Sequence, residues 1–366
     1  MKKVKKLTIV SMTAILAASS LAACGSSSTP NATTAAAAAE TTAASETTAS
    51  NESTSAAKES SQAAAESGGA KTAGDKKFKV GICQLVQHNA LDAATKGFEE
   101  TLEKELGDNV TIDLQNAQGD SATCATIVNG FVSNEYDLIM ANATPALQAA
   151  VSATTDIPIL GTSVTDYGTA LNMSNFSGTT GINVSGTSDL APLDQQEDMI
   201  LELVPDVKKV GILYCSAEAN SKFQATQIEK YLDEDGVQYQ EYTFSDSNDL
   251  QSVVTSAVGN IDALYIPTDN TAASNMTVVN NVTEPAKIPV ICGEENMMKS
   301  GGLATLSISY YDLGAATAKQ AIDILVNGAD VSTMEIAYAS ATTKEYNKKY
   351  ADAIGITIPS DYTAVE

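Results

Sequence analysis

The chain has 366 residues, with 45 acidic residues against 21 basic ones and a formal net charge of −24. Every basic residue is lysine, and there is a single histidine. So acidic a surface repels nucleic-acid phosphates, which argues against DNA or RNA binding. One histidine excludes a metal site with two histidine ligands, and the lack of arginine excludes a bidentate guanidinium clamp for an anion. We expect no metal site and no cofactor.

Residues 1–23 have the pattern of an export signal. Lysines lie within residues 1–6, and the uncharged apolar run 7–23 that follows is shorter than the roughly 20 residues of a membrane span. The end of this segment, Leu21-Ala22-Ala23-Cys24-Gly25, resembles a bacterial lipobox. The resemblance implies cleavage before Cys24, lipidation of its thiol, and attachment to the extracytoplasmic face of the cell membrane. An ordinary signal peptide with a chance cysteine is the alternative.

Residues 25–75 consist mostly of Ala, Ser and Thr and contain no Val, Ile, Leu, Met, Phe or Tyr. Such a segment cannot bury enough apolar surface to offset the entropy lost on ordering. We therefore expect residues 24–75 to be a disordered tether between a lipid anchor and a folded body.

The remaining cysteines are Cys83, Cys124, Cys215 and Cys292. In an exported protein they could form two disulfide bridges. Three of them lie in apolar runs, where a free cysteine acts as a small hydrophobic residue. We expect buried free thiols.

From residue 76 onward, short apolar runs rich in Val and Ile alternate with longer amphipathic stretches. The runs predict strands at 78–84, 110–116, 137–143, 157–163, 209–215, 238–244, 263–267, 288–293, 303–309 and 334–339. The amphipathic stretches predict helices at 90–106, 121–134, 145–154, 217–235, 249–259, 271–285 and 311–326. This alternation is typical of parallel sheets covered by helices on both faces.

Two halves of the body follow one plan. Val80-Gly81-Ile82 recurs as Val210-Gly211-Ile212, and Asp156-Ile157-Pro158 recurs at nearly the same offset as Lys287-Ile288-Pro289. The pattern predicts an α/β fold with two doubly wound parallel-sheet lobes joined by a hinge of several crossovers. We expect the first lobe to contain 76–187 plus about 302–330, and the second to contain 188–301 plus about 331–366.

Ligands of open α/β sheets bind beyond the carboxyl ends of the strands. Polar and aromatic residues at those ends form the predicted site, which consists of Gln84, His88, Thr144, Pro145, Thr165, Asp166, Ser188, Asp189, Asn220, Ser221, Asp269, Asn270, Glu294 and Tyr310. Carboxylates suit a ligand ammonium group, whereas hydroxyls and helix N-termini suit a carboxylate. A zwitterion such as an amino acid fits both, with Asp189 or Asp269 as the ammonium acceptor and Thr144 near the carboxylate. The alternatives are that Thr144 and Asp269 are helix caps and that His88 is a surface residue. Of Tyr310 and Tyr311, we expect one ring to reach the cleft.

Signatures of catalysis are missing from the sequence, which contains no G-x-x-x-x-G-K-[ST], G-x-G-x-x-G, G-x-S-x-G or H-E-x-x-H. We therefore predict a binding protein with no catalytic residues.

The body also resembles a known family, the ABC-transporter substrate-binding proteins of the tryptophan/tyrosine type, which have the type I periplasmic-binding-protein fold. The motifs that carry this resemblance run through the whole body and include Gln115-Asn116-Ala117-Gln118-Gly119-Asp120, Ala143-Thr144-Pro145-Ala146, Val164-Thr165-Asp166, Asn183-Val184-Ser185-Gly186-Thr187-Ser188-Asp189, Asn220-Ser221, Pro267-Thr268-Asp269-Asn270 and Tyr311-Asp312-Leu313-Gly314.

The resemblance implies two lobes that close on one small ligand, most simply an aromatic amino acid. It also implies delivery to a membrane permease driven by a cytoplasmic ATPase, and we expect a monomer. Two departures affect the ligand, since Asn89 and Tyr167 stand where the family usually or often has proline. Tyr167 would add a ring to the pocket or partly fill it. A nucleoside- or sugar-binding protein and a ligand-sensing subunit are the alternatives, and a cell-surface hydrolase is less favoured.

Overall fold

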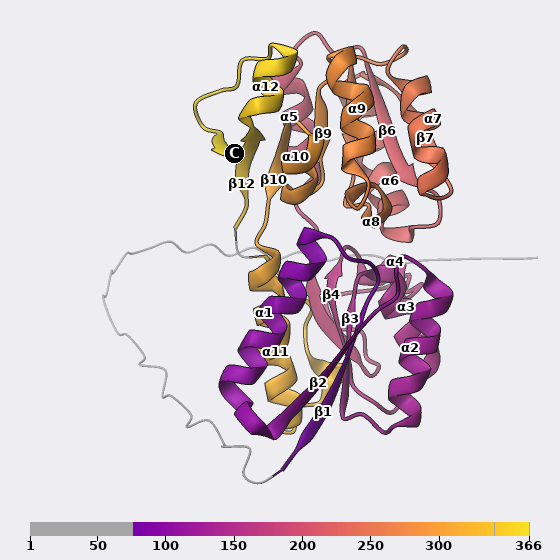
Figure 1. The fold of residues 1–366 in the computed structure, drawn as a ribbon, viewed down its shortest axis with the longest axis vertical. Helices are drawn as coiled ribbons and strands as arrows, with labels where there is room; N and C mark the ends of the chain where they lie inside the picture. Colours follow the sequence, from indigo (N-terminus) through magenta and orange to yellow (C-terminus); the bar gives the residue numbers. More distant parts are fainter. Residues whose placement is uncertain (1–75, 340, 366) are drawn as a thin grey trace, which may run out of the picture. The chain divides into compact units, whose positions relative to one another are not determined.

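The computed structural model describes residues 76–339 and 341–365, which form two sheets covered by helices (Figure 1). The predicted signal peptide, Cys24 and the predicted tether lie outside the described residues. Parallel pairing predominates in both sheets, which confirms the predicted α/β class.

The first sheet has the strand order β11-β5-β4-β3-β1-β2 within the described residues, and all its pairs are parallel. Its strands are β1 (Phe78–Gln84), β2 (Val110–Asn116), β3 (Leu138–Asn142), β4 (Ile159–Val164), β5 (Val184–Ser188) and β11 (Ala337–Tyr338). The helical segments around it are α1 (Asn89–Leu106), η1 (Gly107–Asn109), α2 (Ser121–Ser133), α3 (Thr144–Ala153), α4 (Tyr167–Ala170), α11 (Tyr310–Leu325) and η2 (Val331–Thr333).

Alternation along β1 supplies apolar side chains to both faces of this sheet. Val80 and Ile82 pack with Phe98 and Leu102 of α1, whereas Cys83 belongs to the apolar cluster on the opposite face. Figure 1 shows α1 and α11 on one side of the sheet and α2 and α3 on the other. This arrangement is expected when successive strand side chains point to opposite faces.

The second sheet has the order β13-β12-β10-β9-β8-β6-β7 within the described residues, and only β12 is antiparallel to its neighbour β10. Its strands are β6 (Lys209–Cys215), β7 (Gln238–Phe244), β8 (Ala263–Ile266), β9 (Val290–Cys292), β10 (Ala304–Ser307), β12 (Thr343–Asn347) and β13 (Thr363–Val365). Its helices are α5 (Leu193–Leu203), α6 (Ala219–Glu234), α7 (Ser247–Ala257), α8 (Asn270–Ala273), α9 (Met276–Ala286), α10 (Glu295–Gly301) and α12 (Lys348–Ile354).

The described chain passes between the two sheets after β5, after β10 and after β11. Two strands therefore lie in the other sheet from the one predicted for their residues. β10 extends the second sheet beside β9 although a boundary near residue 302 was expected, and β11 pairs with β5 in the first sheet although 331–366 was assigned to the second lobe. Hydrophobic patterning identifies a strand but not its neighbour, because either sheet edge can accept it.

The predicted helix at 271–285 is two helices, α8 and α9, with Ser274 and Asn275 between them. Asp269 caps the first helix, because its Oδ1 accepts the Ala272 N–H at 2.8 Å. Side-chain caps also start α2 at Asp120 and α11 at Ser309. These caps satisfy N–H groups that have no partner inside a helix.

All four cysteines of the described residues are buried free thiols, as expected from their apolar surroundings. Tyr167 is buried as well, and its hydroxyl donates to the Thr187 carbonyl at 3.1 Å. A Cβ at Gly161 or Gly186 would meet that hydroxyl, so the two glycines leave the space that the ring end occupies. Tyr167 therefore fills a slot between β4 and β5 and does not line the cavity described below.

Candidate functional site

Loops at the carboxyl ends of strands from both sheets enclose a small cavity of about 10 Å³. Its lining residues are His88, Leu91, Ser163, Thr165, Asp189, Asn220, Thr268, Asp269, Asn270, Ala273, Glu294 and Tyr310. Eight of them belong to the predicted site. The volume holds about one water molecule, whereas small-molecule sites are typically several hundred Å³. A ligand of amino-acid size therefore requires the walls of this cavity to move apart.

Two hydrogen bonds join loops of the two sheets at the small cavity. Thr165 Oγ1, which follows β4, lies 3.2 Å from Thr268 Oγ1, which follows β8. His88 Nε2, which precedes α1, lies 3.2 Å from Asn270 Oδ1 at the start of α8. The loops of both sheets are thus in direct contact in this structure.

Asp189 is the buried acidic residue that directly follows β5. Its Oδ2 accepts a hydrogen bond from the Tyr310 hydroxyl at 2.8 Å, whereas its Oδ1 is buried without a partner. Burial raises the pKa of the Asp189 carboxyl, although the hydrogen bond from Tyr310 opposes that shift. A buried carboxylate oxygen without a donor is costly, so this atom is suited to accept a hydrogen bond from a bound cation.

The other two carboxylates of the small cavity have backbone donors on both oxygens. Asp269 accepts the N–H groups of Ala272 and Cys215 at 2.8 and 2.7 Å. Glu294 accepts those of Met297 and Asn296 at 2.6 and 2.7 Å. Burial, with a smaller contribution from nearby Glu218, raises the pKa of Asp269 to about 8, and burial raises the pKa of Glu294 to about 7. Both residues act as helix caps, whereas Asp189 is the one of these three carboxylates with an oxygen that accepts no hydrogen bond.

The two adjacent tyrosines behave differently. Tyr310 is 5% exposed and contributes to the small cavity, whereas Tyr311 is 39% exposed and donates to Glu100 Oε2 at 2.8 Å. Consecutive residues at the start of a helix point about 100° apart, so only one of the two rings can face inward.

Six predicted residues do not line the small cavity. Gln84 is buried beside α1, where its Nε2 donates to Asp92 Oδ1 at 2.7 Å. Thr144 and Pro145 begin α3, and the hydroxyl oxygen of Thr144 is buried without a partner.

The other three residues support the loops that carry the site. The Ser188 hydroxyl donates to the Thr165 carbonyl at 2.8 Å. Asp166 caps α4 by accepting the Thr169 N–H at 2.6 Å. Ser221 is buried next to Asn220. Their roles toward a ligand stay predictions.

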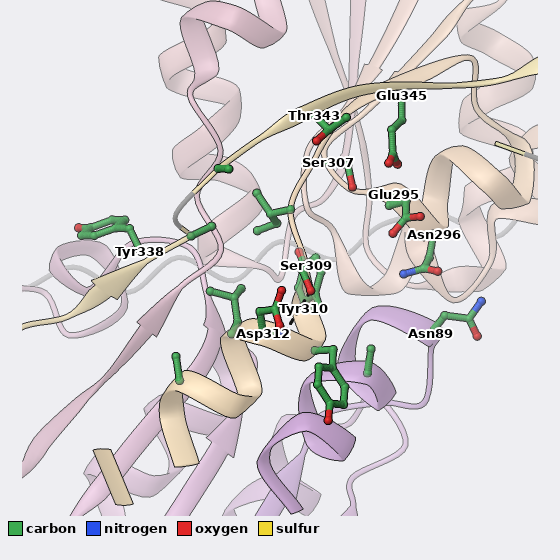
Figure 2. Close-up of a pocket in the computed structure, with 17 residues that line it drawn as sticks. Asn89, Glu295, Asn296, Ser307, Ser309, Tyr310, Asp312, Tyr338, Thr343 and Glu345 are labelled. Carbon is green, nitrogen blue, oxygen red and sulfur yellow. Dashed lines mark hydrogen bonds between the residues drawn. The ribbon is translucent and has the colours of Figure 1, made fainter. Parts of the chain in front are cut away.

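A larger cavity of about 610 Å³ lies next to the segments that connect the sheets (Figure 2). It shares only Tyr310 with the predicted site. Glu295 and Glu345 lie on one side of it, and Tyr338 lies at its edge. The carboxyl ends of the strands, where the predicted residues gather, instead surround the small cavity, which is therefore the candidate site.

Comparison with known proteins identifies the family. The model of a family described as ABC transporter substrate binding protein matches residues 79–364. The chain belongs to this family. A tyrosine-binding protein from Clostridioides difficile strain R20291 is 42% identical to this substrate-binding protein over 258 residues, which cover 70% of this chain and 74% of that protein.

Solved structures agree with the family and with the type I periplasmic-binding-protein fold. The ABC domain from Streptococcus pneumonia in complex with L-Trp has a TM-score of 0.76 and 35% identity, and the match covers 80% of this chain and all of that one. The ligand-free, open structure of a substrate binding protein with adhesive properties from Clostridium difficile has a TM-score of 0.62 and 40% identity. That match covers 79% of this chain and 99% of the other. A solute binding protein from Clostridium phytofermentas with bound L-rhamnose shares only the fold, at 13% identity, a TM-score of 0.56 and coverage of 76% and 99%.

The structure of this substrate-binding protein adds residues that the sequence alone did not single out. Ser163, near the end of β4, and Thr268, in the loop after β8, line the small cavity, and both lie close to the carboxyl ends of their strands. Ser163 has a φ of 53°, a rare conformation for a residue with a side chain, and its hydroxyl oxygen is buried without a partner. Such backbone strain is concentrated at functional sites, but it has no signature in the sequence.

Proposed function

We propose that this chain is the extracytoplasmic binding component of an ABC importer and that it binds an aromatic amino acid between the loops of its two sheets. The tyrosine-binding relative and the L-Trp complex support this class of ligand. The observation that carries the proposal is the unpartnered Oδ1 of buried Asp189. None of the described residues that line the small cavity is a lysine, so no lysine side chain of the lining competes with a ligand ammonium group for Asp189.

The ligand ammonium group would bind Asp189 rather than Asp269, because only Asp189 has an oxygen without a donor. The hydroxyl of Ser163 is an unpartnered group of the same cavity and could donate to the ligand carboxylate. The earlier prediction that Thr144 serves the carboxylate remains, since its hydroxyl is also unpartnered. Tyr310 would present part of its ring to the ligand side chain.

We infer that this structure represents the closed conformation. The hydrogen bonds of Thr165 and His88 across the small cavity support this inference. So does the TM-score, which is higher with the L-Trp complex than with the more identical ligand-free, open protein. The closed state that ligand binding selects would hold these loops slightly further apart than they are here, because a cavity of about 10 Å³ has no room for an amino acid.

At the membrane, we propose that a lipid on Cys24 anchors the protein at the extracytoplasmic face and that a permease with its ATPase receives the ligand. Among the described residues, every helix is too short or too polar to span a bilayer. The lipobox-like sequence supports the anchor, and the family supports the transporter. The protein binds its ligand without chemical change in this role.

Replacing Asp189 by asparagine tests the proposed ammonium site. The full-length chain should show a higher melting temperature with L-tyrosine, L-tryptophan or L-phenylalanine, because a ligand that binds only the native state stabilises it. In Asp189→Asn, the dissociation constant measured by calorimetry should rise roughly 30-fold or more, the equivalent of losing about 2 kcal/mol of charge-assisted hydrogen bonding.

The exposed Asp206, replaced by asparagine, is the control for the loss of one negative charge, and it should leave affinity unchanged. Wild-type affinity in Asp189→Asn would contradict the role of Asp189. A melting shift only with a nucleoside or a sugar would contradict the proposed ligand class.

A further inference from the structure

Glu218 is a buried carboxylate next to the small cavity but not part of its lining. It precedes α6, and all hydrogen-bond partners of its side chain are donors. Oε1 accepts from the backbone N–H and the hydroxyl of Thr271 at 2.9 and 2.8 Å. Oε2 accepts from the backbone N–H and Nδ2 of Asn270 at 3.0 and 2.7 Å, and from Asn220 Nδ2 at 3.3 Å. One carboxylate thus holds two asparagine side chains by their NH₂ groups.

This contact determines which end of the Asn220 amide is available to the small cavity. A carboxylate only accepts hydrogen bonds, so the reversed amide would place its carbonyl oxygen against the oxygens of Glu218. Asn220 Nδ2 also donates to the Thr268 carbonyl at 2.9 Å. With the nitrogen engaged on that side, Oδ1 of Asn220 is left buried without a partner.

The same contact determines the tautomer of His88. With Asn270 Nδ2 bonded to Glu218, Asn270 Oδ1 lies 3.2 Å from His88 Nε2 and can only accept. The ring hydrogen of neutral His88 is therefore on Nε2, and Nδ1 is an acceptor. Burial lowers the pKa of His88, which favours the neutral ring. Nδ1 is buried without a partner.

Three acceptors without donors thus belong to residues of one small cavity, namely Asp189 Oδ1, Asn220 Oδ1 and His88 Nδ1. A primary ammonium group has three N–H donors. We propose that Glu218 is a positioning residue that orients Asn220 and His88 so that, together with Asp189, they form a three-acceptor site for a primary ammonium group. This inference rests on the proposed function and specifies which chemical group of the ligand is selected.

The test compares two ligands that differ in the ammonium group. L-tyrosine carries it, and 3-(4-hydroxyphenyl)propanoate has the same ring and carboxylate without it. In the wild-type full-length chain, L-tyrosine should bind more tightly. Glu218→Gln keeps the shape of the side chain but supplies a donor at one of the two acceptor positions, so the amides and the imidazole lose their fixed orientation. The selectivity is the dissociation constant of 3-(4-hydroxyphenyl)propanoate divided by that of L-tyrosine. In Glu218→Gln this ratio should fall roughly 10-fold or more, a loss typical of removing a supporting hydrogen bond from a charged site.

Glu234→Gln is the matched control, because Glu234 is an exposed residue at the end of the same helix. It should leave the ratio unchanged. An equal weakening of both ligands in Glu218→Gln would overturn the proposal, because a purely structural defect does not distinguish ligands by their ammonium group.

Asn220→Ala gives a second route to the answer if Glu218→Gln does not fold, since it removes one of the oriented oxygens and keeps the carboxylate. A selective loss for L-tyrosine supports the site, and an unchanged ratio overturns it. If the wild-type chain binds neither aromatic compound, the proposed function itself fails, and this inference fails with it.

Discussion

Buried acidic side chains around the small cavity differ in the donors that reach them. Asp269 and Glu294 each accept two backbone N–H groups, whereas Asp189 accepts one tyrosine hydroxyl on one oxygen. The chemical type of the residue is the same in all three, so function at this scale depends on which oxygens are already engaged. A buried acceptor without a donor requires an explanation, and the proposed ligand contact at Asp189 supplies one.

Stability at the residue scale should depend on pH through Glu294. Its carboxyl is buried, with a pKa raised to about 7, whereas in the unfolded chain it ionises near pH 4.5. Between these values unfolding releases a proton, so rising pH favours the unfolded state. The contribution of Glu294 to the free energy of unfolding, measured in urea, should therefore be complete below about pH 4.5 and fall as the pH rises to about 7. Glu294→Gln should remove part of that fall, at most about 3 kcal/mol.

The control for this experiment is Glu234→Gln, which replaces an exposed carboxyl and should keep the wild-type pH profile. If the free energy of unfolding falls by the same amount with rising pH in Glu294→Gln and in the wild type, Glu294 is not the cause of the pH dependence.

At the element scale, α1 and α11 pack closely because both carry a glycine at the contact. A Cβ on Gly314 would meet the Ala94 carbonyl, and a Cβ on Gly97 would meet the Tyr311 carbonyl. These helices come from opposite ends of the body, and α11 begins at Tyr310, which contacts Asp189. The two glycines therefore allow α11 to pack closely on α1, and α11 carries Tyr310 to its contact with Asp189.

Gly314→Ala should destabilise the protein by about 1–3 kcal/mol, because the added methyl group forces the two backbones apart. Urea unfolding measures this change. Gly130→Ala in α2 is the matched control, because nothing lies within 4 Å of its added Cβ. It should stabilise the protein by about 0.5–1 kcal/mol through higher helix propensity. If both variants are destabilised by similar amounts, the close contact between α1 and α11 is not the reason that Gly314 is required.

For the whole molecule, the central feature is direct contact between loops of the two sheets around a cavity of about 10 Å³. Entry of an amino acid requires these loops to separate, and the chain crosses between the sheets at three places where such motion could be absorbed. Small-angle scattering should show a larger radius of gyration without ligand than with saturating L-tyrosine. Asp189→Asn at the same ligand concentration should show a smaller change. An identical radius with and without ligand in the wild type would contradict closure.

Local sequence determined most of the regular structure. The strands β1, β2, β6 and β7 have the predicted bounds, because β-branched or aromatic residues recur at short intervals along each of them. Short or atypical elements were not predicted as such. β5 contains Val184-Ser185-Gly186-Thr187-Ser188, which has little strand propensity, and tertiary pairing with β4 and β11 makes it a strand.

The sequence by itself determined the α/β class and the strand ends at which the polar residues of the small cavity gather, because these depend on hydrophobic periodicity and on the carboxyl-end rule. It favoured free cysteines but left two disulfide bridges open, and the structure shows four buried free thiols. Only the tertiary structure decided that β10 lies in the second sheet and β11 in the first, and that Tyr310 rather than Tyr311 faces Asp189. It also decided that Glu218 orients Asn220 and Asn270. The reason is physical, since hydrogen-bond partners distant in sequence are brought together only by packing. Those partners decide whether an acidic residue becomes a helix cap, as Asp269 does, or keeps an oxygen without a donor, as Asp189 does.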